Sequence, residues 1–142
     1  MDKPNSTMAQ QIAHAASAFE QQRTGNTPKS VTAVLSDTTL VITLRDALSP
    51  AEKALARSPA GAAQVREFHR QLFATGSDPL RREIERITGV EVREATADIE
   101  AIAGAVMKRF PTGTVVQVFL LAHSVPANAW SGRASSREPV CV

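Results

Sequence analysis

The sequence predicts an α+β domain in which a four-stranded, mainly antiparallel sheet has amphipathic helices packed on one face. Two neighbouring stretches, 31–36 and 40–44, alternate apolar and polar residues, which is typical of a β-hairpin with one buried face. Elsewhere apolar residues recur every three or four positions, as they do on the buried side of a helix. Taken in order, the patterns predict a helix, two strands, three helices, a strand, a helix and a strand.

The length of the chain limits the number of domains, and its charge limits the kinds of partner that it can bind. The chain has 142 residues, enough for one domain with its own core. We predict a single domain over residues 1–123 and a flexible tail over 124–142, which is rich in Ser, Pro, Ala and Arg. The net charge is only +2, and acidic and basic residues are mixed along the chain. Aromatic residues make up 4% and tyrosine is absent, so we expect no nucleic-acid partner.

Cysteine and histidine usage argues against a disulfide or metal site. Cys141 is the only cysteine, which excludes a disulfide within the chain and suits a reducing cytoplasm. His14, His69 and His123 have no His, Cys or carboxylate neighbour at metal-ligand spacing, so no metal and no cofactor are expected. Since no apolar run reaches membrane-spanning length and no signal-peptide pattern is present, the expected location is cytoplasmic.

The first helix and the hairpin have the clearest boundaries. Thr7 and Gln10 form a capping box, and the helix that they open is predicted to end near residue 22, before Gly25. A two-residue turn at 37–38 then fixes the hairpin register, because it places apolar residues opposite one another. The pairs on this buried face are Leu35 with Leu40, Ala33 with Ile42, and Val31 with Leu44. The other face, with Val34 opposite Val41, is half apolar, which suggests that another surface covers it.

The segment after the hairpin carries the sharpest local signal. Ser49 is predicted to be an N-cap, Pro50 the first helical residue, and Glu52 the reciprocal partner in a capping box. This role commits the Ser49 hydroxyl to the backbone, and no Gly-x-Ser-x-Gly turn surrounds it, which argues against a nucleophile. Glu52 and Lys53 project about 100° apart on a helix, so they are not a catalytic pair. We therefore predict that the protein is not an enzyme.

Two longer helices follow, each opened by a capping residue and a proline. The first is predicted from Pro59 to about Ala74, and the second begins at Asp78-Pro79 and ends at Gly89. The predicted buried positions are Ala62, Val65, Phe68 or His69, and Leu72 in the first helix, and Leu80, Ile84 and Ile87 in the second.

The last part of the domain is predicted to contain two strands and one helix. Val90 and Val92 indicate a short strand, and Asp98 is predicted to cap a helix whose apolar stripe is Ile99, Ile102, Val106 and Phe110. The β-branched stretch 114–121 is the strongest strand pattern, so we expect it at the centre of the sheet.

Four arginines form the candidate binding surface. Arg66, Arg70, Arg81 and Arg82 lie on the two longer helices and could bind an anion or a protein partner. Charged neighbours at i,i+3 and i,i+4 spacing are also typical of an ordinary solvated helix face, as for Arg81 and Glu85.

Several motifs occur in a defined order along the chain. They are Gly25-Asn26-Thr27-Pro28, Leu48-Ser49-Pro50-Ala51-Glu52-Lys53-Ala54-Leu55, Val65-Arg66-Glu67, and Ile84-Glu85-Arg86-Ile87-Thr88-Gly89. In this order they resemble the MpsC-like family of bacterial domains, labelled the third component of a sodium-translocating, membrane-potential-generating system. The resemblance covers about residues 8–95 and resumes at 115–121. The chain differs at Thr27, where the family has a second glycine, and at 97–113, where a helical pattern replaces a short acidic loop.

The resemblance implies association with membrane ion transport or bicarbonate supply through a soluble accessory domain, and it supplies no catalytic residues. We therefore predict a non-enzymatic accessory or regulatory domain that binds a protein partner, forms a homodimer and associates with a membrane complex without spanning the membrane. The alternative is a small-molecule or anion sensor that uses the four arginines.

Overall fold

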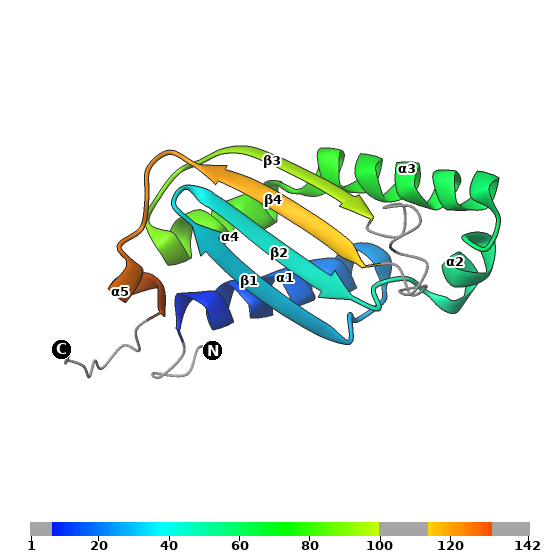
Figure 1. Ribbon diagram of the computed structural model, residues 1–142, viewed down its shortest axis with the longest axis horizontal. Coiled ribbons are helices and arrows are strands. Elements are labelled where there is room, and N and C mark those ends of the chain that lie inside the picture. The colour runs from blue at the N-terminus through cyan, green and yellow to red at the C-terminus, as the bar shows by residue number, and fades with distance from the viewer. Residues whose placement is uncertain (1–6, 100–113, 132–142) are drawn as a thin grey trace.

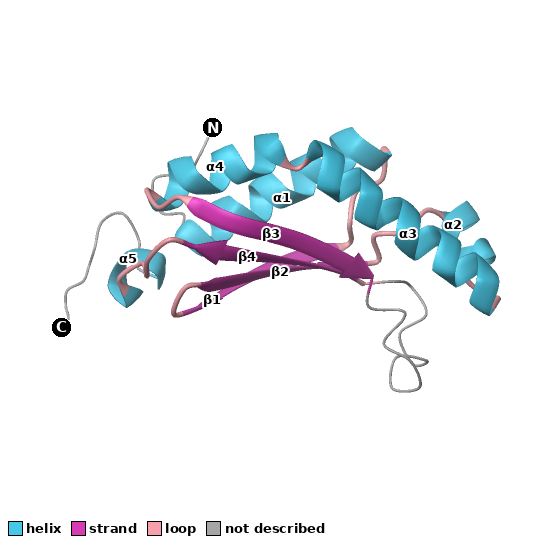
Figure 2. Cartoon of the chain, turned by 90° about the horizontal axis from the view of Figure 1, so that it is seen from above, coloured by secondary structure: helices cyan, strands magenta, loops and turns pink. Residues whose placement is uncertain are grey.

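A four-stranded antiparallel sheet with helices on one face makes up the fold, as the sequence predicts (Figures 1 and 2). The computed structural model describes residues 7–99 and 114–131. The elements are α1 (Met8–Thr24), β1 (Ser30–Ser36), β2 (Thr39–Arg45), α2 (Pro50–Leu55), α3 (Pro59–Gly76), α4 (Asp78–Thr88), β3 (Val92–Ile99), β4 (Val115–Leu121) and α5 (Ala127–Ser131). The strand order is β1-β2-β4-β3, and Figure 2 shows α1, α3 and α4 together on one side of the sheet.

The hairpin has the predicted register. Leu35 pairs with Leu40 and Val31 with Leu44, and Asp37 takes the positive φ of 57° that closes the two-residue turn. The inward side chains of β2 are fully buried under the helices. The predicted burial of this face is therefore confirmed.

The strand β4 lies at the centre of the sheet, as its apolar sequence predicts, and pairs with β2 on one side and β3 on the other. Its inward positions are Val115, Gln117, Phe119 and Leu121, all buried. Phe119 contacts the ring of Phe73 on α3 edge-on, with ring centroids 5.8 Å apart, so β4 anchors the helical layer.

The helix boundaries follow the predicted capping residues closely. Thr7 and Gln10 form the capping box of α1, which ends at Gly25 with a left-handed φ of 79°. Gly89 ends α4 in the same conformation. At the start of α4, Ser77 and not Asp78 occupies the N-cap position, and it makes no side-chain capping bond.

On α3 the structure decides between the two alternative buried positions that were predicted, and it shifts another predicted buried position by one residue. His69 is the inward residue, whereas Phe68 is 53% exposed, and Phe73 is buried in place of Leu72. Val65, His69 and Phe73 are spaced by four residues, so they lie in one row along the helix facing the sheet.

Two predictions in the C-terminal third need correction. Asp98 is not a helix cap, because β3 extends to Ile99 and pairs with β4 up to that residue. The rest of the predicted helical stripe lies outside the described residues. The segment predicted to be a flexible tail also begins with structure, since Val125 is buried in the core and Ala127–Ser131 forms α5. Residues 132–142 lie outside the described part, and the domain boundary at 123 stays a prediction.

The predicted capping box of α2 is present. Glu52 N–H donates to Ser49 Oγ at 3.2 Å, and Ser49 N–H donates to Glu52 Oε1 at 2.9 Å. We expect Ser49→Ala to lower the free energy of unfolding by about 1 kcal/mol, because one backbone donor loses its partner. Urea denaturation monitored by circular dichroism measures this change, with Ser58→Ala, the cap of α3, as the comparison. An unchanged midpoint for Ser49→Ala would show that the box contributes nothing.

Candidate functional site

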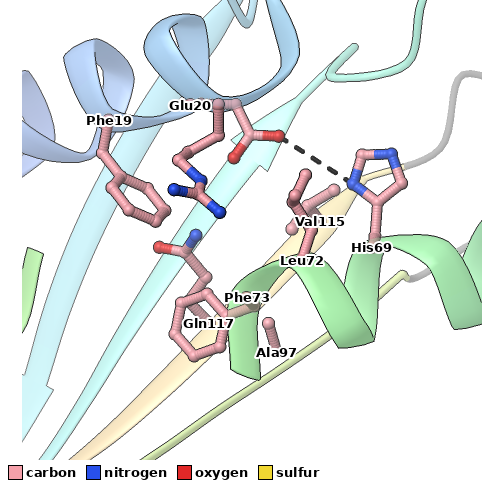
Figure 3. Close-up of a pocket in the computed structure, with 9 residues that line it drawn as sticks. Phe19, Glu20, His69, Leu72, Phe73, Ala97, Val115 and Gln117 are labelled. Atoms are coloured by element: carbon pink, nitrogen blue, oxygen red, sulfur yellow. Dashed lines mark ion pairs between the residues drawn. The ribbon is translucent and has the colours of Figure 1, made fainter. Parts of the chain in front are cut away.

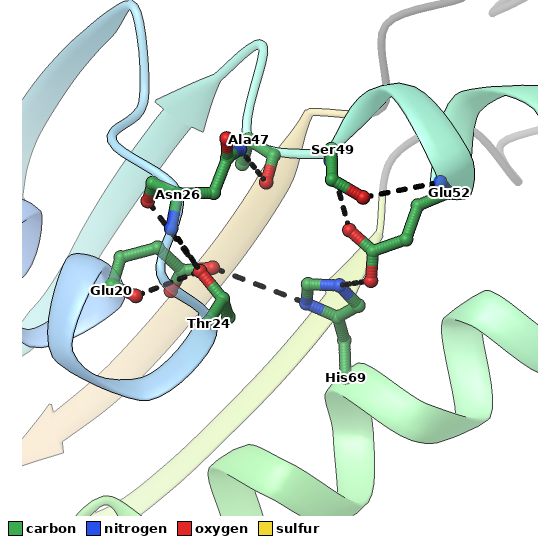
Figure 4. A network of polar contacts seen from close by, with 7 residues as sticks. All are labelled: Glu20, Thr24, Asn26, Ala47, Ser49, Glu52 and His69. Atoms are coloured by element: carbon green, nitrogen blue, oxygen red, sulfur yellow. Dashed lines mark hydrogen bonds and ion pairs between the residues drawn. The ribbon is translucent and has the colours of Figure 1, made fainter.

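The chain brings one histidine between two glutamates inside the fold (Figure 4). His69 on α3 is 6% exposed, and its Nε2 lies 2.9 Å from Glu52 Oε2 at the start of α2. Its other ring nitrogen, Nδ1, lies 4.0 Å from Oε2 of Glu20, near the end of α1. We call these three residues the Glu–His–Glu cluster. It joins three helices that are separate in the sequence.

Glu52 has two roles at once in this cluster. One carboxylate oxygen accepts the Ser49 N–H in the capping box, and the other contacts His69 Nε2. The sequence-based expectation that Glu52 is used only to start a helix is therefore incomplete. Because the capping box fixes the carboxylate plane, the second oxygen is held in place for the imidazole.

Glu20 is positioned by the last turn of α1. Its backbone carbonyl accepts a hydrogen bond from Thr24 Oγ1, which also receives the Asn26 N–H, and Asn26 Nδ2 donates to the Ala47 carbonyl beyond β2 (Figure 4). These bonds tie the end of α1 to the segment that leads into α2. The two carboxylates thus approach His69 from a connected polar framework.

Burial dominates the electrostatics of Glu20. Removal from water raises the pKa of its carboxyl, the nearby His69 lowers it in part, and the charge of Glu52 raises it further. Glu20 Oε2 is buried and has no hydrogen-bond partner among the described residues. Because the folded carboxyl holds its proton to a higher pH than the unfolded one, its contribution to stability decreases as pH rises above about 4.5.

A small cavity lies beside Glu20 on the inner face of β4 (Figure 3). Its volume is about 20 Å³, enough for one water molecule. Phe19, Glu20, His69 and Gln117 line it, and Gln117 Oε1 is a second buried acceptor with no partner among the described residues. One water molecule could donate to both acceptors.

The closest contact in the cluster joins His69 Nε2 to Glu52 Oε2 at 2.9 Å, a distance at which a proton can be shared. Both ring nitrogens of His69 face carboxylates, and the adjoining cavity has room for one water molecule. The cluster therefore links α1, α2 and α3 through polar side-chain contacts. No three His, Cys, Asp or Glu side chains in residues 7–99 and 114–131 are arranged to hold a metal ion.

The sequence contained a partial signal for this cluster. Glu20 continues the buried row Ile12 and Ala16 at intervals of four, and His69 stands between Val65 and Phe73 in the same way. A titratable residue in a buried row needs a partner, which is the clue. Nothing in the sequence identified Glu52 as that partner.

The structure places the four predicted binding-surface arginines on two helices, Arg66 and Arg70 on α3 and Arg81 and Arg82 on α4. Arg81 Nη2 donates to the Val92 carbonyl at 3.0 Å, so this guanidinium joins α4 to the start of β3. Arg70 pairs with Glu67 at 3.6 Å and lines an open groove between α3 and β3. Arg66 is half-buried and Arg82 is exposed. Their use as an anion or partner surface stays a prediction.

These features define a two-layer α+β domain with a largely buried Glu–His–Glu cluster between its helices and a sheet whose other face is free of described helices. The chain belongs to the family described as Na+-translocating membrane potential-generating system (MpsC), whose family model matches residues 5–121. The resemblance seen in the sequence motifs is thereby confirmed. Comparison with curated proteins and with solved structures gives no match. None of the helices in the described part of the chain is long and apolar enough to cross a membrane.

Proposed function

We propose that this chain is a non-enzymatic accessory or regulatory domain of a membrane potential-generating system, located in the cytoplasm, and that it acts by binding a membrane-embedded component of that system. Membership in the MpsC family links the chain to such a system. The observation that supports protein binding is the outer face of the sheet, which no described helix covers (Figure 2).

The outer face presents one row of apolar side chains that crosses three strands. Val34, Val41 and Val118 are directly opposite one another on β1, β2 and β4. Val34 is 59% exposed, and Leu120 on the same face is also exposed. An apolar patch that spans three strands is typical of a protein-binding surface. A membrane-embedded component that exposes apolar side chains at the membrane boundary would be able to pack against this face.

The proposed mode of action is mechanical and not catalytic. A component bound at the outer face would contact the sheet. The helices on the opposite face would then remain free to move. The Glu–His–Glu cluster links α1, α2 and α3 within this layer. The alternative function is an anion sensor that uses the four arginines on α3 and α4.

The test places a charge at the centre of the outer face. We expect Val118→Glu to reduce co-purification with the membrane-embedded components of the system at least tenfold, because a carboxylate would be buried in the interface without a partner. The measurement uses the full chain, co-expressed with those components, extracted in detergent and quantified by its molar ratio in the purified complex.

The matched control is Gln64→Glu, which makes the same change of charge at an exposed position of α3 in the opposite layer. It should leave the ratio unchanged. Circular dichroism of both purified variants is used to check that each is folded. A folded Val118→Glu that retains the full ratio would overturn the proposed binding face.

A further inference from the structure

The two edges of the sheet differ in how well they are protected. At the β3 edge, the pairing with β4 is interrupted by a register shift between Val92 and Glu94, and Arg93 and Glu94 are charged and exposed. Val92 is also engaged by α4, since Arg81 donates to its carbonyl and Glu85 Oε2 accepts its N–H. Charges, bulges and covered backbone are the features that keep a strand edge from pairing with another chain.

The β1 edge has none of these features. Its seven residues, Ser30–Ser36, include no charged residue and no proline, and they pair with β2 without interruption. Within the described residues, no strand lies on the other side of β1. An uncharged, regular edge of this length is able to accept a further strand.

The hydrogen-bonding direction of β1 follows from the rest of the sheet. The Leu121 N–H donates to the Thr38 carbonyl, so the even-numbered residues of β2 direct their backbone groups towards β4 and the odd-numbered ones towards β1. The odd-numbered residues of β2 pair with even-numbered residues of β1, as Val41 does with Val34. The backbone N–H and C=O groups of Val31, Ala33 and Leu35 therefore point out of the sheet edge.

We propose that two copies of this chain join through antiparallel pairing of their β1 strands, with Ala33 on the two-fold axis. In this register Ala33 is opposite the partner's Ala33, and Val31 is opposite the partner's Leu35. All three outward-directed residues of each strand then meet outward-directed residues of the other, so each free N–H finds a carbonyl. The result is one continuous eight-stranded sheet.

The side chains of β1 are complementary to themselves in this register. On the inner face Val31 meets the partner's Leu35, and on the outer face Thr32 meets the partner's Val34. Small Ala33 side chains meet at the axis, and polar Ser30 meets the partner's Ser36 at the ends. An isologous two-fold contact requires this kind of self-complementarity.

Charge complementarity favours the same register. Lys29 and Asp37, both exposed, flank the strand on its two sides. With Ala33 on the axis, Lys29 lies opposite the partner's Asp37, which gives two opposite-charge pairs per dimer. A shift of the register by two residues separates these charges and leaves part of each strand unpaired. The ends of β1 therefore select one alignment.

The inference names the surface of the homodimer that the sequence analysis predicts, and it is compatible with the proposed function because the outer face remains available for the membrane component. Joining the β1 strands would place two outer faces side by side and so duplicate the apolar row through Val34 and Val118. One dimer could then engage two copies of the component, with a gain in affinity from their linkage.

Cysteine cross-linking of the full chain tests the alignment. In a Cys141→Ser background, we expect Ala33→Cys to form a disulfide-linked dimer under mild oxidation, because residues directly opposite in a hydrogen-bonded pair are about 5.5 Å apart at Cα. The control Ser36→Cys should not cross-link, since six residues at about 3.4 Å each separate it from the partner's Ser36. Equal cross-linking at both positions would overturn this register.

Sedimentation velocity of the unmodified chain at high micromolar concentration provides the second measurement. The expected result is a dimer. Ala33→Pro should raise the dissociation constant of this dimer at least a hundredfold, because proline removes the Ala33 N–H at the centre of the contact. The monomer should tolerate the change, since this N–H points out of the sheet edge and does not pair with β2. A strict monomer, or a dimer unaffected by Ala33→Pro, would overturn β1 pairing. A monomer that still binds the membrane component through Val118 would overturn only the pairing and leave the proposed function standing.

Discussion

Replacing His69 with alanine should lower the free energy of unfolding by about 1–3 kcal/mol, the cost of leaving a buried polar group without its hydrogen-bond partner. The variant would leave Glu52 and Glu20 facing an empty space in the helical layer, and Glu20 is almost fully buried. Neither carboxylate would have the imidazole that now lies 2.9 Å from one and 4.0 Å from the other. Urea denaturation at neutral pH measures the loss.

The loss should also depend on pH in a defined direction. Burial raises the pKa of Glu20 and His69 counteracts part of this rise, so without His69 the folded pKa should be higher still. A raised folded pKa means that the folded state binds more protons than the unfolded state, and stability then falls as pH rises above about 4.5. The destabilisation by His69→Ala should therefore increase from pH 4 to pH 7.

The control for this experiment is His14→Ala, because His14 is exposed on α1. Its effect should stay within about 0.5 kcal/mol. A loss below 1 kcal/mol for His69→Ala, or a loss independent of pH, would show that the Glu–His–Glu cluster carries little of the packing between α1, α2 and α3.

The sequence predicted the parts of the fold that depend on near neighbours. The capping boxes at Thr7 and Ser49 need only residues three positions apart, and the hairpin register follows from a two-residue turn with apolar alternation on both sides. The central position of β4 followed from its nearly continuous apolar sequence, which is rich in valine. Each of these signals is contained within one element or one turn.

The parts that sequence reasoning missed depend on contacts between distant elements or on weak patterns. Glu52 and His69 are 17 residues apart and meet only because α3 folds back past α2. The strand β3 was cut short in the prediction, since its inward residues after Val92 are the alanines Ala95 and Ala97, which give little alternation. The Asp98 signal for a helix cap then outweighed the strand.

A methyl group added at Gly61 should cost about 1–3 kcal/mol, the usual range for overpacking, because it has no space between α2 and α3. A Cβ at this position would lie 1.9 Å from the backbone carbonyl oxygen of Leu55, the last residue of α2. A backbone atom cannot rotate away, so Gly61→Ala must move the two helices apart. This movement would also draw Glu52 away from His69 and weaken the cluster.

Gly76→Ala is the matched control, because the same added methyl group meets a different obstacle. Its Cβ would lie 2.0 Å from Arg23 Nη2, the end of a flexible and exposed side chain that can move aside. Alanine is also favoured over glycine in a helix by about 1 kcal/mol, so Gly76→Ala should be neutral or stabilising. Thermal and urea denaturation measure the change in stability of the two variants. If Gly61→Ala is as stable as Gly76→Ala, the α2–α3 joint is not close-packed, and the position of Glu52 must be held by its capping box alone.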